Sequence, residues 1–132
     1  MITLVTAALI KHNNTILIAQ RKQNDLLGGY WEFPGGKIED GESPEECLAR
    51  ELYEELGTTA DITKFFTETT YEYEHGTIRL LAFAAIVKDP SQMRLTDHER
   101  IAWVSPENLL SYRLAPADIA IAKEVLSRYS EL

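Results

Sequence analysis

The strongest constraint on the fold is a helix whose two ends are both marked in the sequence. Ser43 suits the N-cap, Pro44 the first helical position, and Glu46 the reciprocal hydrogen bond of a capping box. Gly57 is typical of the residue just beyond a helix C-terminus. The spacing therefore predicts a helix over residues 44–56. Its expected buried stripe consists of leucines spaced four residues apart: Leu48, Leu52 and Leu56.

The same part of the chain carries most of the net negative charge. Residues 37–55 contain eight acids against Lys37 and Arg50, so they account for six of the eight net charges. Three glutamates fall within one helical arc of about 100° beside the leucine stripe: Glu51, Glu54 and Glu55. Two interpretations are open. One is a solvated face on which Arg50 pairs with Glu46 and Glu54, and the other is a site for a divalent cation such as Mg²⁺.

The rest of the chain alternates strands and helices. Strands are expected at residues 2–10, 15–20, 30–33, 65–73, 77–87 and 101–104. Ser105 before Pro106 predicts a short helix, and Pro116 begins a last one. The expected buried face of that last helix is formed by Ile119, Ala122, Leu126 and Tyr129. We expect an α/β fold with a central mixed sheet, forming one domain over residues 1–132.

Composition excludes several classes of function. The chain has 13 Lys and Arg against 21 Asp and Glu, a balance that disfavours general binding to nucleic acid or to a membrane surface. The apolar residues 1–10 are too short to span a bilayer and lack the features of a signal peptide. The single Cys47 excludes an internal disulfide and a four-cysteine zinc site. We expect a cytoplasmic protein.

The histidines show no metal-ligand spacing. His12, His75 and His98 fall in expected turns, which predicts surface positions for all three.

The acidic helix and the loop before it resemble the Nudix family. The family motif is G-x5-E-x7-R-E-U-x-E-E-x-G-U, where U is apolar. Thr58 stands where the last apolar residue is usual, and this difference concerns packing more than chemistry. The matching residues are Gly36, Glu42, Arg50, Glu51, Leu52, Glu54, Glu55 and Gly57.

The resemblance extends beyond the motif. The segment 31–37, WEFPGGK, is similar to the MutT-like branch of the family. The segment 112–119, YRLAPADI, is similar to a subgroup of CTP pyrophosphohydrolases within that branch. The resemblance implies an α/β/α sandwich and Mg²⁺-dependent hydrolysis of nucleoside triphosphates to monophosphate and pyrophosphate, with Mn²⁺ able to substitute.

The resemblance also implies a role for each matching residue. The metal would be bound by the carbonyl of Gly35 and by Glu51, Glu54 and Glu55. The implied catalytic residues are Glu51, Glu54, Arg50, which would orient a metal-binding glutamate, and Asp97. Glu99 competes with Asp97 for the role of distal metal ligand or base. The implied substrate-binding residues are Arg21, Glu32, Phe33 and Asp118.

Substrates other than CTP, dCTP or oxidised nucleoside triphosphates stay open at this point. The single cysteine excludes the zinc site usual in the NADH-cleaving branch. Tyr73 and Glu74 stand where the ADP-ribose branch tends to carry a proline. Dinucleoside polyphosphates are a further possibility, and so is a nucleotide-sensing domain without turnover. A pool-sanitising enzyme, as a monomer or a homodimer, is the preferred interpretation.

Asp118 is the candidate for reading the nucleobase. An ionised aspartate only accepts hydrogen bonds, so it suits an exocyclic amine such as cytosine N4, and it suits cytosine N3 only when protonated. The alternative is structural: Asp118 follows Pro116 by two residues and would stabilise the start of a helix through its dipole.

Overall fold

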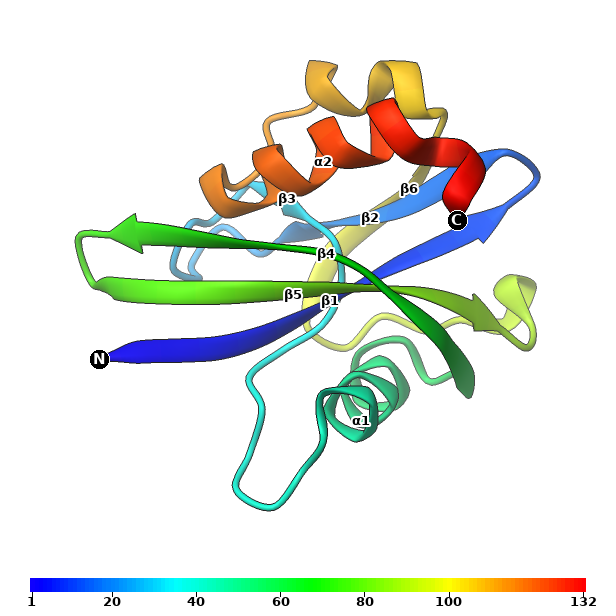
Figure 1. Ribbon diagram of the computed structural model, residues 1–132. Coiled ribbons are helices and arrows are strands. Elements are labelled where there is room, and N and C mark those ends of the chain that lie inside the picture. Colours follow the sequence, from blue (N-terminus) through cyan, green and yellow to red (C-terminus); the bar gives the residue numbers. More distant parts are fainter.

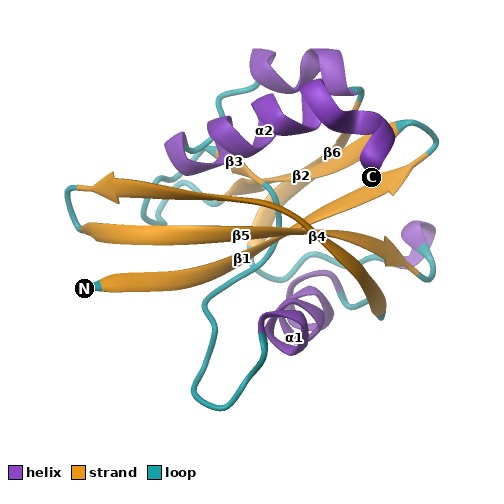
Figure 2. Ribbon diagram, viewed as in Figure 1, coloured by secondary structure: helices purple, strands orange, loops and turns teal.

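The computed structural model describes residues 1–132. A central sheet lies between helix α1 (Pro44–Leu56) on one face and helix α2 (Pro116–Arg128) on the other (Figure 1). The strands are β1 (Ile2–His12), β2 (Thr15–Arg21), β3 (Trp31–Glu32), β4 (Ala60–Tyr73), β5 (Gly76–Val87) and β6 (His98–Val104). Short 3-10 helices lie at η1 (Pro90–Gln92), η2 (Pro106–Ser111) and η3 (Tyr129–Glu131). This layered arrangement confirms the expected α/β fold with a mixed sheet (Figure 2).

The sheet opens between β1 and β2. The two strands pair antiparallel only at Lys11 and His12, next to their turn, and β2 then pairs with β3 and β6. Over Ile2–Ile10, β1 instead pairs in parallel with β5, which pairs antiparallel with β4. The free edge of β1 is occupied by the loop after β3, because the amide of Ala8 donates to the carbonyl of Pro34 at 2.7 Å. This opening positions the candidate site.

Two apolar cores fill the space between the sheet and the helices. Along β1, Ala7 and Leu9 belong to the core under α2, whereas Ala8 and Ile10 belong to the core under α1. A strand covered on both faces has apolar residues at successive positions, which explains the continuous apolar run at the start of the sequence.

Helix α1 has the predicted bounds and the predicted ends. The Ser43 side chain accepts a hydrogen bond from the amide of Glu46 at 3.1 Å, and the Glu46 carboxylate accepts from the amide of Ser43 at 2.9 Å. At the other end, Gly57 has a left-handed φ of 65°, which favours glycine. The leucine stripe is fully buried. Local signals therefore determine this element.

Two strands begin earlier than the sequence predicts. β4 begins at Ala60 rather than at residue 65, and β6 begins at His98 rather than at residue 101. In β4, register shifts near Lys64 and Phe66 interrupt the alternation of apolar and polar residues on which the prediction depends. In β6, the added residues are polar and pair with the end of β2.

The buried face of α2 also differs from the prediction. Ile119 and Leu126 are 36% and 47% exposed, so their assignment to the core is wrong. The face that packs on the sheet consists of Ala117, Asp118, Ile121, Ala122 and Val125. It contains an aspartate, and a hydrophobic pattern assigns such a residue to the solvent side. No helix of the structure is both long enough and apolar enough to cross a membrane.

The cap of α1 gives a direct test of these contacts. We expect Ser43→Ala to lower the free energy of unfolding by about 1 kcal/mol, because the amide of Glu46 loses its acceptor. Ser105→Ala is the matched control, since Ser105 also precedes a proline but its side chain makes no cap hydrogen bond. Denaturant unfolding of both variants measures the difference. Equal destabilisation by the two substitutions would contradict the assigned cap.

Candidate functional site

Two adjoining cavities lie at the opening of the sheet. The larger has a volume of 230 Å³ and is lined from β1, β3, β5 and the start of α2. The smaller has a volume of 200 Å³ and has no apolar side chain in its lining, so we call it the acidic cavity. It is lined by Arg21, Asp25, Glu32, Gly35, Glu55, Asp97 and His98. Arg21, Glu32 and Gly35 line both cavities, which therefore form one continuous site.

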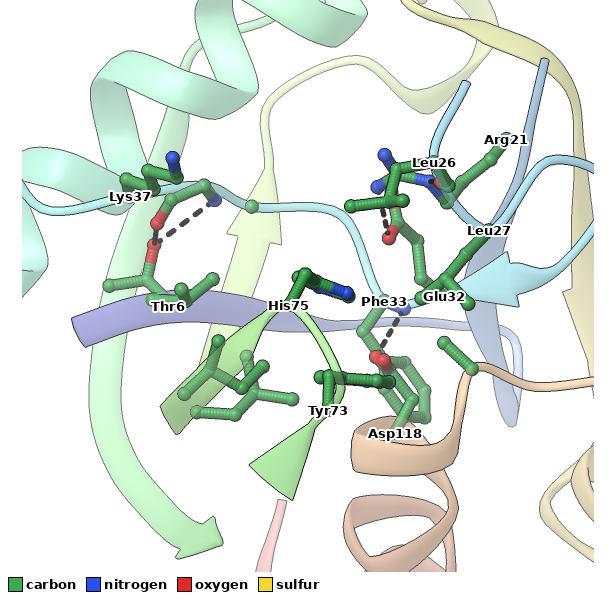
Figure 3. A pocket seen from close by; sticks show the side chains of 16 residues that line it. Thr6, Arg21, Leu26, Leu27, Glu32, Phe33, Lys37, Tyr73, His75 and Asp118 are labelled. Carbon is green, nitrogen blue, oxygen red and sulfur yellow. Dashed lines mark hydrogen bonds and ion pairs between the residues drawn. The ribbon is translucent and has the colours of Figure 1, made fainter. Parts of the chain in front are cut away.

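A glycine loop joins the sheet to α1 at this site. The amide of Thr6 donates to the carbonyl of Gly36 at 2.8 Å, and the Thr6 hydroxyl donates to the same carbonyl at 3.1 Å (Figure 3), which fixes the loop along β1. A Cβ atom at Gly35 would overlap the carbonyl of Thr6, and a Cβ atom at Gly36 would overlap the carboxylate of Glu51. Gly35 therefore needs glycine because it lies against the backbone of β1, whereas a side chain at Gly36 would have to displace the Glu51 carboxylate.

Arg50 holds the carboxylates of α1 together. Its guanidinium donates to Glu42, to Glu51 at 3.3 Å and to Glu54 at 3.2 Å. The hydrogen bonds from Arg50 lower the pKa of Glu42 to about 2, so this carboxylate stays ionised. The expected pairing of Arg50 with Glu46 is wrong, because the Glu46 carboxylate is used in the capping box.

Glu55 differs from the other glutamates of α1 because it is buried. Its side chain is 8% exposed, and its Oε1 atom is buried without a hydrogen-bond partner. Burial, followed by the neighbouring Glu51, raises the pKa of Glu55 far above its usual range. A buried carboxylate oxygen without a partner is costly unless a cation or a donor meets it.

The acidic side chains fit a divalent cation by chemistry, although they do not form a finished metal site. No three Asp, Glu, His or Cys side chains already converge on one point. Glu51 and Glu54 are paired with Arg50 instead, and Glu54 has 55% of its side chain exposed and is free to turn. The fit rests on the unpartnered Glu55 oxygen and on the oxygen donors around it, which hard divalent cations prefer.

The two candidate distal acids differ in position. Asp97 and Glu99 are both exposed, but Asp97 lines the acidic cavity and Glu99 does not. The structure thus brings Asp97 to the same cavity as Glu55 and Gly35. Asp25, from the loop after β2, is a further acid there that the sequence analysis missed.

His98 is the clearest error of the sequence analysis. It was expected in a surface turn, but its side chain is only 4% exposed and it begins β6. Its Nε2 lies 2.8 Å from Glu32, and its Nδ1 lies 3.9 Å from the unpartnered Oε1 of Glu55. Arg100 is exposed and the register shifts beside Arg21, so the alternation of β6 is interrupted and no periodic signal in the sequence marks His98 as buried.

Glu32 is held from two sides. It accepts from Arg21 at 3.1 Å as well as from His98, and the Nε of Arg21 donates to the carbonyl of Leu26 at 2.6 Å. Arg21 therefore fixes both the carboxylate and the loop that closes one side of the larger cavity, where Leu26 and Leu27 form part of the wall (Figure 3).

Asp118 lies at the base of the larger cavity. Residues 113–115 pair with Trp31 through two backbone hydrogen bonds of 2.8 Å. The Asp118 side chain adds a third contact between the same two segments by accepting from the amide of Phe33 at 3.1 Å. Burial first, and then Glu32, raise the pKa of Asp118 well above its usual range. The alternative that Asp118 serves only the dipole of α2 does not account for this contact.

The predicted residues thus fall into four groups according to the cavity that they line. Asp97 and Glu55 line the acidic cavity alone. Gly35, Arg21 and Glu32 line both cavities. Phe33 and Asp118 line the larger cavity alone. Arg50, Glu51 and Glu54 line neither cavity and lie beside them on α1.

The part of the larger cavity next to the β4–β5 turn carries none of the predicted site residues. Tyr73 and His75 line it there, with their rings 5.0 Å apart and nearly parallel (Figure 3). Lys37 also lines this cavity. The larger cavity therefore combines flat rings with a cation.

Comparisons with known proteins agree with this geometry. The sequence matches the NUDIX domain family over residues 2–127. It is 37% identical over 123 residues to a CTP pyrophosphohydrolase of Escherichia coli, covering 93% of this chain and 90% of that protein. It is 36% identical over 116 residues to a putative 8-oxo-dGTP diphosphatase 2 of Mycobacterium tuberculosis, covering 87% and 82%.

Solved structures show the same fold. A crystal structure of a MutT protein from Methanosarcina mazei superposes with a TM-score of 0.85 at 27% identity, over 99% of this chain and 96% of that one. A family match over nearly the whole chain, a motif that keeps all of its glutamates and this fold lead to one conclusion: the chain belongs to the Nudix family of hydrolases.

Proposed function

We propose that the protein is a metal-dependent nucleoside triphosphate pyrophosphohydrolase, which splits a nucleoside triphosphate with water into a monophosphate and pyrophosphate. The observation that carries this proposal is the continuity of the two cavities. The larger cavity offers rings and a buried acid to a nucleoside, and the acidic cavity next to it offers carboxylates to a metal-bound polyphosphate. Gly35 lies at the junction, where the two parts of such a substrate meet.

The chain's own residues supply positioning and charge. Glu55, Glu51 and Glu54, with the Gly35 carbonyl, are the proposed ligands of a divalent cation, with Mg²⁺ preferred and Mn²⁺ able to replace it. Bound there, a divalent cation neutralises the polyphosphate and makes a water molecule more nucleophilic. Asp97 is the proposed acceptor of the proton from that water, because it is the distal acid that lines the acidic cavity.

At the nucleoside end, Arg21 and Glu32 form the proposed contact to the sugar. Their ion pair and the hydrogen bond from His98 hold Glu32 in one orientation. Phe33 is the proposed apolar contact beside them, since it lines the larger cavity and its amide fixes Asp118.

The preferred substrates are CTP or dCTP and oxidised or otherwise modified nucleoside triphosphates, which correspond to the names of the relatives. Hydrolysis of a dinucleoside polyphosphate is the second candidate, since the cavities are open at the surface. A sensing role without turnover has less support, because the motif keeps all of its glutamates. A cytoplasmic monomer or homodimer of one domain, with no nucleic acid or membrane partner, stays a prediction.

Asp118 is the proposed reader of the nucleobase. Its Oδ1 is bound to the amide of Phe33, so Oδ2 is left to meet a base in the larger cavity. The raised pKa of Asp118 favours the neutral carboxyl, which donates an O–H to an acceptor such as cytosine N3. Ionisation turns the same atom into an acceptor. The protonation state of Asp118 therefore selects which base edge it fits.

Replacing Glu55 tests the metal site. We expect Glu55→Gln to lower kcat/KM by about 100-fold or more, since a metal ion contributes several kcal/mol to the transition state. The metal-free variant should melt no lower than the wild type, because the raised pKa means that Glu55 must take up a proton when the chain folds near neutral pH, whereas a glutamine is neutral in both states. The rise in Tm that Mg²⁺ or Mn²⁺ produces in the wild type should disappear.

Glu45→Gln is the matched control, because Glu45 lies on the same helix but is exposed and distant from both cavities. It should keep both the turnover and the metal-induced rise in Tm. Full turnover of the wild type in excess chelator would exclude metal-dependent hydrolysis altogether.

A pH comparison with Asp118→Asn tests the base reading. The asparagine amide keeps an acceptor for the amide of Phe33 and donates toward the cavity at every pH. In the wild type, the raised pKa means that the donor is present at lower pH and is lost as pH rises through that pKa. The ratio of kcat/KM between CTP and 8-oxo-dGTP should therefore diverge between the two proteins with rising pH, by about 5- to 150-fold.

Steady-state kinetics across pH measures this ratio, and titration of the substrates cancels because both proteins receive the same nucleotides. If the ratio of kcat/KM between the two substrates changes with pH in the same way in both proteins, the base is read by other residues.

A further inference from the structure

We propose that the hydroxyl of Tyr73, on β4, caps helix α2 from outside the helix and thereby sets the substrate discrimination of the base reader Asp118. Tyr73 is then a positioning residue for specificity, and the inference rests on the proposed function of Asp118. Two hydrogen bonds hold the first turn of α2, one to the Tyr73 hydroxyl and one from the amide of Phe33.

Helix α2 begins without a cap of its own. Its N-cap residue is Ala115, which has no side-chain acceptor, and Pro116 follows it without an amide hydrogen. The next amide, on Ala117, donates to the Tyr73 hydroxyl at 3.0 Å. Because Ala117 is only 1% exposed, this amide would otherwise be buried without an acceptor.

The first turn of α2 is therefore attached to two different strands at successive residues. Ala117 is bound to β4 through the Tyr73 hydroxyl, and Asp118 is bound to the residue after β3 through the amide of Phe33. Tyr73, Phe33 and Asp118 lie together at one end of the larger cavity (Figure 3). Together the two contacts fix the height and the rotation of the Asp118 carboxyl at the base of the cavity.

Without the Tyr73 hydroxyl, the amide of Ala117 would compete with the amide of Phe33 for the Asp118 carboxyl. The amide of Ala117 would then lack an acceptor, since the amides of Asp118 and Ile119 already donate to the carbonyl of Ala115, and Asp118 is the acid of that turn. An Asp118 carboxyl drawn toward the helix start would present its free oxygen differently to a base. The Tyr73 hydroxyl prevents this by satisfying the amide of Ala117 itself.

The hydroxyl can be separated from the ring. The Tyr73 ring forms part of the cavity wall, stacks with His75 at 5.0 Å and lies tilted against Tyr71 at 4.6 Å. Tyr73→Phe keeps these ring contacts and removes only the acceptor for Ala117. Tyr71→Phe is the matched control, because Tyr71 is exposed, does not line the cavity, and its hydroxyl has no hydrogen-bond partner within the chain.

We expect Tyr73→Phe to change the ratio of kcat/KM between CTP and 8-oxo-dGTP by about 2- to 12-fold at one pH, the factor that one hydrogen bond provides. The amide of Ala117 should exchange with solvent faster in this variant, as measured by NMR. Tyr71→Phe should change neither quantity.

A second substitution provides the rescue. Ala115 has φ −57° and ψ 142°, an extended conformation that suits a serine N-cap. In the double variant Tyr73→Phe with Ala115→Ser, the serine hydroxyl can accept from the first turn of α2. We expect the double variant to recover the wild-type ratio and the slow exchange of the Ala117 amide.

The outcomes separate this inference from the proposed function. An unchanged ratio in Tyr73→Phe, or a changed ratio that Ala115→Ser fails to restore, overturns the role of the hydroxyl. Parallel pH profiles for wild type and Asp118→Asn overturn the base reader. If those profiles are parallel and the Tyr73→Phe ratio still shifts and is rescued, the cap is supported and its target is another residue of the cavity.

Discussion

The candidate site depends on a close backbone contact at Gly35 and on a side-chain contact at Gly36. Gly35 lies against the carbonyl of Thr6 on β1, and Gly36 lies against the carboxylate of Glu51 on α1. The loop after β3, which contains both glycines, replaces β2 along the edge of β1 and joins the sheet to α1 at the point where the sheet opens. Both cavities form at this junction. A side chain at Gly35 would push the loop away from β1, whereas a side chain at Gly36 would displace the carboxylate of Glu51.

The same junction concentrates charge at a cost that the fold only partly offsets. Arg50 compensates Glu42, Glu51 and Glu54 through direct hydrogen bonds. Glu55 has no such partner, and burial raises its pKa instead. A chain selected for stability alone would place an apolar residue there. The uncompensated carboxylate therefore points to a ligand that arrives from solution, which links the energetics of α1 to its proposed chemistry.

Sequence patterns predicted those parts of the structure whose determinants are local. The bounds of α1 follow from Ser43 and Gly57, and both act within one turn of the helix. His98 was misplaced because its burial depends on Arg21, which lies opposite it across a bulge between β2 and β6. The inward face of α2 was misplaced because Asp118 is bonded to Phe33, 85 residues earlier. Such contacts leave no periodic pattern in the sequence.

The site follows the same division between local and distant determinants. The glutamates of α1 are recognisable because one helix fixes their spacing, and the motif preserves it. The walls of the larger cavity come from separate segments, so Tyr73 and Asp118 face each other only after β4 and α2 have packed. The proposed metal ligands can thus be recognised from one segment, whereas the proposed base reader depends on tertiary contacts. On this proposal, substitutions at Tyr73 would change specificity without altering the helix that carries the proposed metal-binding carboxylates.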